Sequence, residues 1–211
     1  MIAIIDYGMA NLRSVEKALA RVGGSPVITG DPDVVARAER VVLPGVGAFC
    51  ACMNNLNARG LNEAVVRAIG DGKPFLGICV GLQMLFDSSS EMGLTPGLGL
   101  LPGRVVKFFE EQAPAGTDGL KVPHIGWNSL RVSRGSQLLC GLEDGARVYF
   151  VHSFYPVPDD PSVISAVTDY GIDFCSAVER GNIAAMQFHP EKSGTVGLQI
   201  LRNFLAWNPV V

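Results

Sequence analysis

The sequence predicts an α/β protein with a doubly wound, mostly parallel central sheet, flanking helices and an added antiparallel β region. Short apolar runs alternate with helical patterns through Phe86, which favours parallel strands joined by crossover helices. From Val105 onward, short β-prone runs follow one another with no long helical pattern between them. At 211 residues, with 48% hydrophobic and 18% charged residues, the chain has the size and composition of a single α/β domain spanning residues 1–211.

The N-terminal elements follow from the spacing of the apolar residues and from the residues that interrupt it. The predicted strands are short apolar runs that end at turn-forming residues, at 2–5, 26–28, 40–43 and 75–78. A helix is predicted over 11–22 and is stopped by Gly23 and Gly24. Asp31-Pro32 is predicted to open a short helix, and a helical region interrupted at Gly60 is predicted to run to Ile69.

The C-terminal part is predicted to be mainly strands, closed by one helix. The β-prone runs lie at 105–109, 129–132, 148–151, 163–167, 174–178 and 183–188. Residues 110–119 are predicted to form an exposed loop, and apolar spacing predicts a helix over 196–205. There is no internal repeat, and we expect no domain boundary.

The residues around Cys79 have the pattern of a nucleophile elbow. Gly77-Ile78-Cys79-Val80-Gly81 follows an apolar strand and precedes an apolar helical start over 82–86; with serine at its centre it would read Gly-x-Ser-x-Gly. A sharp strand-to-helix turn crowds the backbone, so the two glycines remove side chains there. Such a turn places Cys79 at a helix N-terminus, where the dipole favours a thiolate. The alternative is a core cysteine, since free cysteines are commonly buried.

The chain has three histidines, and one of them stands beside a carboxylate in the sequence. His189 and Glu191 are two residues apart, so in an extended segment their side chains lie on the same side. Pro190 disfavours the helical conformation for His189. An imidazole oriented by a carboxylate serves as the base for a thiol nucleophile in a catalytic triad. The alternative is an exposed turn with a solvated Glu191, and for His124 and His152 a structural role is favoured.

Two other kinds of site fit the sequence poorly. Cys50-Ala51-Cys52 lacks the two-residue spacing and the second ligand pair of a zinc site. The glycine-rich segment 44–49 lacks the Lys-Ser/Thr ending of a phosphate loop, and no Gly-x-Gly-x-x-Gly pattern occurs in the chain. The residue patterns therefore favour nucleophilic catalysis over metal or nucleotide chemistry.

Charge and composition bear on partners and compartment. A net charge of −3 gives no reason to expect nucleic acid or an anionic membrane as a partner. No apolar span is long enough to cross a bilayer, and the first residues reach Asp6 without a basic region, so we expect no signal peptide. The five cysteines are odd in number and lack the spacing of a disulfide framework, so we expect a reduced, cytoplasmic setting.

With its elbow cysteine, its late His-Pro-Glu and its glycine-rich loop after the third strand, the chain resembles the class I (triad) glutamine amidotransferases. Within that class it is similar to the glutaminase subunits of imidazole glycerol phosphate synthases. The matching blocks span nearly the whole chain and lie at 4–9, 11–15, 43–49, 121–128 and 187–194. Two departures stand out: Ala10 occupies a place where glycine is expected, and Cys50-Ala51-Cys52 is unusual after Phe49.

The resemblance implies a glutaminase that hydrolyses glutamine to glutamate and passes ammonia to a (β/α)₈-barrel cyclase subunit in a heterodimer. That cyclase would make imidazole glycerol phosphate and aminoimidazole carboxamide ribotide in histidine biosynthesis. The implied catalytic residues are Cys79 as nucleophile, His189 as base and acid, and Glu191 as orienter. The implied oxyanion donors are the Val80 N–H and the backbone at Val46 and Gly47. The implied glutamine-binding residues are Gln83, Ser153 and Phe154, and Tyr149 is implied at the cyclase interface. No metal or organic cofactor is implied.

Three alternatives remain open. The chain could serve another synthase, such as the pyridoxal phosphate type, although the block 122–128 argues against it. It could be a free-standing cysteine hydrolase that shares the elbow, which turnover without a partner would favour. It could also be a non-catalytic subunit that only scaffolds a partner, although an intact Cys79, His189 and Glu191 argue against that.

Overall fold

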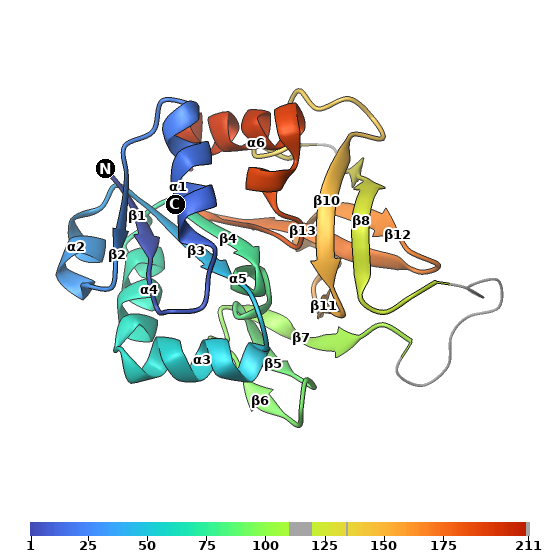
Figure 1. The fold of residues 1–211 in the computed structure, drawn as a ribbon, viewed down its shortest axis with the longest axis horizontal. Coiled ribbons are helices and arrows are strands. Elements are labelled where there is room, and N and C mark those ends of the chain that lie inside the picture. The colour runs from blue at the N-terminus through green and yellow to red at the C-terminus, as the bar shows by residue number, and fades with distance from the viewer. Residues whose placement is uncertain (110–119, 134, 210–211) are drawn as a thin grey trace.

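A central sheet with helices on both faces forms the body of the molecule (Figure 1). The computed structural model describes residues 1–109, 120–133 and 135–209, so the loop predicted at 110–119 lies outside the described residues. The order of the strands in the sheet is β2-β1-β3-β4-β14-β13-β12-β9. The strands from β2 to β14 pair in parallel, and those from β14 to β9 pair antiparallel. The predicted α/β class with a mostly parallel sheet and an added antiparallel region is confirmed.

The strands of this sheet are β1 (Ile2–Ile5), β2 (Pro26–Thr29), β3 (Arg40–Gly45), β4 (Phe75–Cys79), β9 (Arg131–Val132), β12 (Ile164–Asp169), β13 (Asp173–Arg180) and β14 (Ile183–Met186). Every residue of β1, β4 and β14 is buried, as expected for strands covered on both faces. Because β14 lies between β4 and β13, the C-terminal part of the chain supplies an inner strand of the sheet.

The helices are α1 (Leu12–Arg21), α2 (Pro32–Arg37), α3 (Phe49–Ala58), α4 (Leu61–Gly70), α5 (Val80–Gln83) and α6 (Gly194–Ala206). Figure 1 shows α1 and α6 together on one side of the sheet, with α2, α3 and α4 on the other. The helix start predicted at Asp31 is confirmed, because its side chain accepts a hydrogen bond from the Asp33 N–H. The break predicted at Gly60 is also confirmed: this residue has a φ of +66° and separates α3 from α4.

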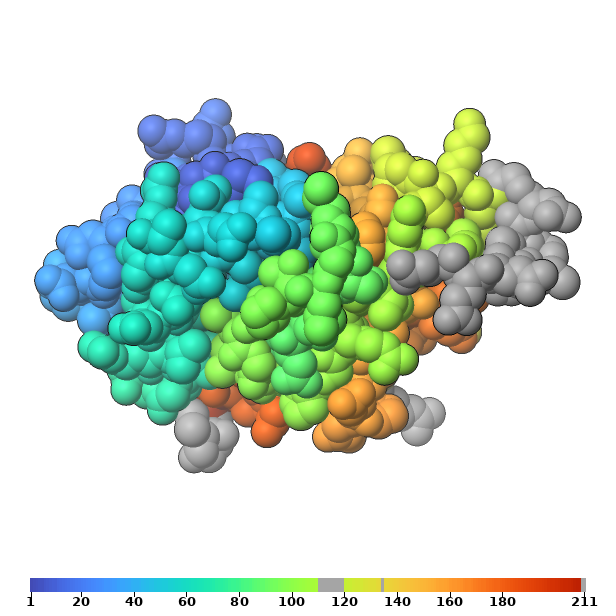
Figure 2. Space-filling view, turned by 90° about the horizontal axis from the view of Figure 1, so that it is seen from below, coloured from blue at the N-terminus to red at the C-terminus, as the bar shows by residue number. Residues whose placement is uncertain are grey.

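Two smaller sheets lie against this body. A hairpin-like pair joins β8 (His124–Ser129) to β10 (Arg147–His152). A second sheet has the order β11-β7-β5-β6, with β5 (Phe86–Ser89), β6 (Thr95–Pro96), β7 (Leu101–Lys107) and β11 (Phe154–Pro158). Figure 2 shows the green segment of β5 to β7 on the surface, between the cyan and teal helices and the yellow-to-orange part of the chain.

Two local predictions are corrected by the structure. The helix after Cys79 stops at Gln83, and Phe86 begins a strand, where the sequence predicted a helical start over 82–86. The reason is tertiary: the carbonyls of residues 84–86 accept hydrogen bonds from the N–H groups of residues 98–101. His124, which the sequence placed in a turn, begins strand β8 and pairs with His152 across the sheet.

The candidate site lies where the carboxyl ends of three adjacent strands meet. Gly45 at the end of β3 stands opposite Cys79 at the end of β4. Met186 at the end of β14 stands opposite Ile78, so the chain that follows β14 leaves the sheet beside the elbow. Open parallel sheets bind ligands at this edge.

Candidate active site

The elbow holds Cys79 in a strained backbone conformation. Cys79 has φ 56° and ψ −113° and is one of three described non-glycine residues with positive φ. Such a conformation is unfavourable for a residue with a side chain and persists only where the surroundings enforce it. Its side chain is 4% exposed and lines a pocket. The following helix is a single turn, so its dipole is smaller than the predicted longer helix would supply.

The two glycines of the elbow are required by space. A Cβ atom on Gly81 would lie 1.8 Å from the carbonyl oxygen of Leu43, a contact that no rotamer change can relieve. A Cβ atom on Gly77 would lie 2.9 Å from both Ala185 Cβ and the Gly81 oxygen. The backbone crowding predicted from the sequence is therefore present, and it seats the elbow firmly between β3 and β14.

His189 and Glu191 form a buried pair behind the pocket. His189 Nδ1 lies 2.8 Å from Glu191 Oε1, and the side chains are 3% and 2% exposed. His189 itself is extended, as predicted, but Glu191 lies in the 3₁₀ turn Pro190–Lys192, so the pair meets across a turn and not along a strand. The backbone N–H of His189 donates to the Tyr149 carbonyl at 3.0 Å, which ties this residue to β10.

The electrostatics of His189 favour the imidazolium. Burial by itself lowers the pKa of His189, whereas Cys79 and Glu191 raise it, and the balance moves the pKa from 6.5 to about 10. Within the described chain, His189 Nε2 makes no hydrogen bond of normal geometry, so this atom is available to a reacting group. A cationic imidazole beside a cysteine is the arrangement that activates a thiol nucleophile.

Gln83 and Gln187 form a hydrogen-bonded pair next to Cys79. Gln187 Nε2 lies 3.7 Å from Cys79 Sγ, and Gln83 Nε2 donates to Gln187 Oε1 at 3.0 Å. Gln83 Nε2 also donates to the Phe154 carbonyl at 3.0 Å. Sequence reasoning did not single out Gln187, which follows β14 directly, because a lone amide carries no pattern of its own.

The pocket at the elbow has a volume of about 280 Å³, which suits a small molecule. The predicted residues that line it are Val46, Gly47, Cys79, Val80, Gln83, Ser153, Phe154 and His189. Glu191 lies behind His189, and Tyr149 is beside the pocket without lining it. Glu91, which the sequence analysis missed, is the carboxylate among the lining residues, and its Oε2 also accepts from the Phe49 N–H at 2.7 Å.

The oxyanion loop, defined here as Pro44-Gly45-Val46-Gly47, does not present all of its donors to the pocket. The Val46 N–H donates to the Met9 carbonyl at 2.9 Å, so it is turned away from any substrate. Gly47 has a φ of +95°, a conformation that glycine adopts freely. Val80 is the first residue of α5, so its N–H has no acceptor within the helix and is available at the pocket.

His124 and His152 form a neutral, stacked pair, which supports the structural role expected for them. His152 Nδ1 lies 2.8 Å from the Phe154 carbonyl and therefore carries the proton there, and its Nε2 lies 3.1 Å from His124 Nδ1. Burial lowers the pKa of His124 to about 4 and that of His152 to about 3. Protonating His152 at Nε2 would set this donor against the Nδ1–H group that His124 donates to it.

Tyr149 packs on the outer side of the triad. Its ring lies 5.6 Å from Lys192 Nζ and meets the half-exposed Trp127 edge-on at 6.3 Å between ring centroids. Its N–H donates to Ser193 Oγ at 3.0 Å. Because the Tyr149 carbonyl accepts from the His189 N–H, a partner that contacts Tyr149 would contact a direct neighbour of His189.

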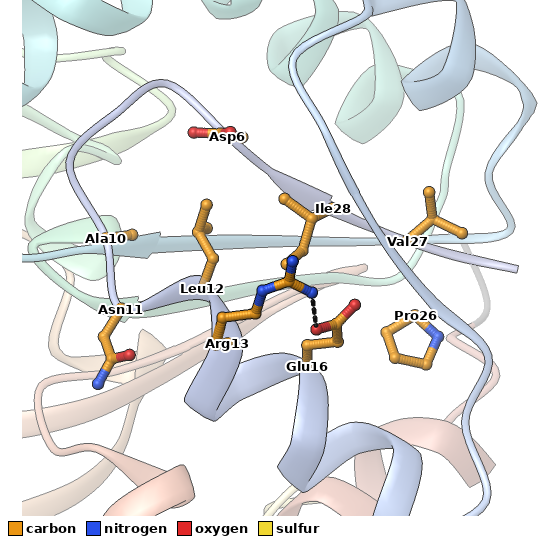
Figure 3. A pocket seen from close by; sticks show the side chains of 9 residues that line it. All are labelled: Asp6, Ala10, Asn11, Leu12, Arg13, Glu16, Pro26, Val27 and Ile28. Carbon is orange, nitrogen blue, oxygen red and sulfur yellow. Dashed lines mark hydrogen bonds and ion pairs between the residues drawn. The ribbon is translucent and has the colours of Figure 1, made fainter.

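A larger hollow than the pocket at the elbow lies elsewhere (Figure 3). It is an open groove of about 740 Å³ between β2 and the start of α1, and it contains the Arg13–Glu16 ion pair. No nucleophile or imidazole lines it. Ala10 borders this groove and does not have a positive φ, so the substitution for glycine there imposes no backbone strain.

No group of three or more His, Cys, Asp or Glu side chains is arranged to hold a metal ion among the residues that the structure describes. Within those residues, too, no helix has the length and apolar character needed to span a membrane. All five cysteines are free.

The comparisons with known proteins agree with this geometry. A family model described as glutamine amidotransferase class-I matches residues 3–207. Over 203 residues the chain is 58% identical to the imidazole glycerol phosphate synthase subunit HisH of Geobacter metallireducens, with 96% of each chain covered. It is 56% identical over 203 residues to the subunit of the same name from Geobacter sulfurreducens, with 96% of this chain and 97% of the other covered.

Solved structures of similar fold lie at lower identity. PurLQS from Thermotoga maritima has a TM-score of 0.74 at 20% identity, covering 97% of both chains. The glutaminase domain of CTPS from Trypanosoma brucei, solved with bound acivicin, has a TM-score of 0.63 at 15% identity, covering 99% of this chain and 95% of the other. At these identities the likeness shows the fold alone.

Proposed function

Because this chain belongs to the class-I glutamine amidotransferase family, we propose that it is the glutaminase subunit of an imidazole glycerol phosphate synthase. It hydrolyses glutamine to glutamate and delivers ammonia to a (β/α)₈-barrel cyclase subunit, which makes imidazole glycerol phosphate and aminoimidazole carboxamide ribotide in histidine biosynthesis. One observation supports this more than any other. Cys79 and His189 line one small pocket, and Glu191 holds the imidazole from behind.

The chemistry follows from the positions of these three side chains. Cys79 Sγ attacks the side-chain carbonyl carbon of glutamine, and the C–N bond breaks to leave a thioester. His189, protonated and oriented by Glu191, gives a proton from Nε2 to the departing ammonia and then takes one from the water that hydrolyses the thioester. Glu191 Oε1 accepts from His189 Nδ1 and keeps the imidazole oriented with Nε2 toward the reacting groups.

The charge that develops on the carbonyl oxygen needs N–H donors. The Val80 N–H supplies one of them beside Cys79, and the oxyanion loop supplies the other. In the observed conformation the Val46 N–H is bound to Met9 and does not serve. One absent donor lowers the rate by about 10²–10³, so the chain by itself is a poor glutaminase.

The amino-acid end of glutamine carries one positive and one negative group, and the pocket lining contains groups that match them. Glu91 is the lining carboxylate that can pair with the ammonium group. Gln83, Ser153 and Phe154 also line the pocket, and the Ser153 hydroxyl can donate to the carboxylate, while Gln83 holds the Phe154 carbonyl in place. No metal or organic cofactor takes part in these steps.

The partner subunit switches the enzyme on. The relatives are named as a subunit of a synthase, and the exposed ring of Trp127 with the neighbouring Tyr149 gives this chain an aromatic surface next to the triad. A cyclase docked there, with its acceptor bound, favours the loop conformation that presents the Val46 N–H because it binds that conformation better.

The test is initial glutamate release by the chain alone, with the cyclase, and with the cyclase plus its acceptor or an unreactive analogue. We expect the rate to rise in that order, by about 10²–10³ overall. Equal rates in all three mixtures would remove the gating and leave an unregulated hydrolase. No release in any of them would favour a scaffold subunit, and activation by the synthase of pyridoxal phosphate alone would assign the chain to that enzyme.

A further inference from the structure

Two buried donors lie directly beneath the oxyanion loop, and the reaction itself does not use them. The Tyr7 hydroxyl donates to the Pro44 carbonyl at 2.9 Å. The Cys52 thiol, from the first turn of α3, donates to the Val46 carbonyl with Sγ 3.5 Å from the oxygen. Neither side chain is exposed to solvent.

Both groups are held in their donating, protonated form. Burial, as the main cause, raises the pKa of Cys52 to about 11, so the thiol keeps its proton at neutral pH. Burial also raises the pKa of Tyr7 well above its ordinary value. Both side chains therefore remain hydrogen-bond donors at neutral pH.

The two hydrogen bonds lie on either side of the Gly45–Val46 peptide unit, which must rotate to present the Val46 N–H to the pocket. The Val46 N–H belongs to the Gly45–Val46 unit and donates to Met9. Tyr7 fixes the carbonyl of the unit before it, and Cys52 fixes the carbonyl of the unit after it. Because peptide units are planar and share their Cα atoms, turning the middle unit displaces both neighbours, and each displacement weakens a buried hydrogen bond.

The loop is also seated closely on these residues. A Cβ atom on Gly45 would lie 2.7 Å from the Tyr7 hydroxyl oxygen and 2.9 Å from Val80 Cβ. Of the two cysteines that depart from the family pattern, only Cys52 faces the loop. Cys50 Sγ instead accepts a hydrogen bond from Asn54 Nδ2 at 3.4 Å on the outer side of α3.

We propose that Tyr7 and Cys52 are positioning residues that latch the oxyanion loop in the conformation with the Val46 N–H turned toward Met9. They thereby set the low glutaminase activity of the chain without its partner. This inference rests on the proposed function, because it concerns the gating of the same reaction. It assigns a role to the Cys52 thiol, which the proposed reaction does not otherwise use.

The experiment compares the parent chain with Tyr7→Phe, Cys52→Ala and Cys52→Ser. Each is assayed for glutamate release alone and with cyclase plus acceptor analogue. Tyr7→Phe and Cys52→Ala should each raise the partner-free rate by about twofold to fivefold, as expected for losing one modest hydrogen bond that favours the resting loop. The partner-activated rate should stay near that of the parent. Cys52→Ser keeps a donor and should remain closer to the parent than Cys52→Ala.

Cys175→Ala is the matched control. Cys175 is another buried thiol that donates to a backbone carbonyl, that of Ala177 at 3.7 Å, but it lies in β13 away from the loop. Its removal should leave the ratio of activated to partner-free rates unchanged. A second readout is hydrogen exchange at the Val46 amide, which should speed up in Cys52→Ala and Tyr7→Phe relative to the amides of β4.

Three outcomes would overturn the latch. The first is an unchanged activation ratio and unchanged Val46 exchange in both Tyr7→Phe and Cys52→Ala. The second is an equal change in Cys175→Ala, which would show general loosening of the core. The third is a fall of the partner-free rate in folded Cys52→Ala. If the parent itself is not activated by the cyclase, the proposed function fails first, and that result is distinct from the other three.

Discussion

The elbow and the oxyanion loop follow neighbouring strands of the same sheet, and both are flanked by glycines, yet they use those glycines differently. At the elbow a Cβ atom on Gly81 would collide with the main chain of Leu43 at 1.8 Å. In the loop a Cβ atom on Gly47 would meet only the flexible end of Met9 at 3.2 Å, and this glycine is needed for its φ of +95°. The elbow is crowded by main chain at both of its glycines, whereas the loop is crowded at Gly45 but has room at Gly47.

In the proposed mechanism, this difference separates two requirements of catalysis. The nucleophile, which must be placed accurately, is on the turn that packing makes rigid. The oxyanion donor, whose absence silences the enzyme, is on the turn that hydrogen bonds hold and can release. Regulation can therefore act on one peptide unit without disturbing Cys79.

The largest effect is expected for Cys79→Ala, which removes the proposed nucleophile from the elbow. We expect glutaminase activity to fall by at least about 10³-fold, as for loss of a triad nucleophile. The loop and the partner surface are untouched, so ammonia-driven synthesis by the complex should continue. Glutamate release and ammonia-dependent product formation measure the two outcomes. A Cys79→Ala chain that still released glutamate near the parent rate would show that another residue attacks.

Glu191→Gln tests whether catalysis by Cys79 on the rigid elbow depends on a correctly oriented imidazole of His189. The amide keeps the shape of the side chain but favours the wrong tautomer of His189, so we expect kcat to fall by about 10²–10³. The change in KM should be small, because Glu191 lies behind His189 and not in the pocket lining. Steady-state kinetics of the activated complex separate the two effects. A rise in KM with kcat unchanged would mean that Glu191 binds substrate instead.

Comparing Gly81→Ala with Gly47→Ala measures the rigidity difference directly. The first change forces a methyl group into the main chain of β3 and should lower the free energy of unfolding by about 3 kcal/mol or more. The second only places alanine at positive φ and should lower it by about 1–2 kcal/mol. Denaturant titration gives both values. Equal losses in the two variants would contradict the contrast between a crowded turn and a free one.

The smallest effect concerns the buried pair of His124 and His152, of which His152 lines the pocket. Their pKa values in the folded chain, about 4 and about 3, are below the ordinary 6.5, so the unfolded chain binds more protons between these limits. Their contribution to stability is fully present above pH 6.5 and is lost as the pH falls toward 4. At pH 6 we expect a loss of about 1–2 kcal/mol. His124→Gln should show a shallower pH dependence in denaturant titrations, and an unchanged slope would mean that other groups dominate.

Much of the fold could be predicted because the apolar runs are short, regular and separated by glycine, proline and aspartate. The end of α5 could not, since hydrogen bonds from residues 98–101, distant in sequence, take up the carbonyls that a longer helix would need. The proposed triad could be predicted because its residues stand in compact motifs. Glu91 and Gln187 could not, as each is a common polar residue whose position only the folded chain reveals. The bond from Val46 to Met9 joins two separate loops, so local patterns do not contain it.

The position of β14 has a consequence for how the protein is made. This strand comes late in the chain but lies in the interior of the sheet, between β4 and β13. During synthesis, β4 therefore waits with an open edge until almost the whole polypeptide has emerged, and such edges invite wrong pairing. The same order delays His189, because it follows β14 directly. A nascent chain thus carries Cys79 without the base proposed for it, and His189 reaches the thiol only when the sheet closes.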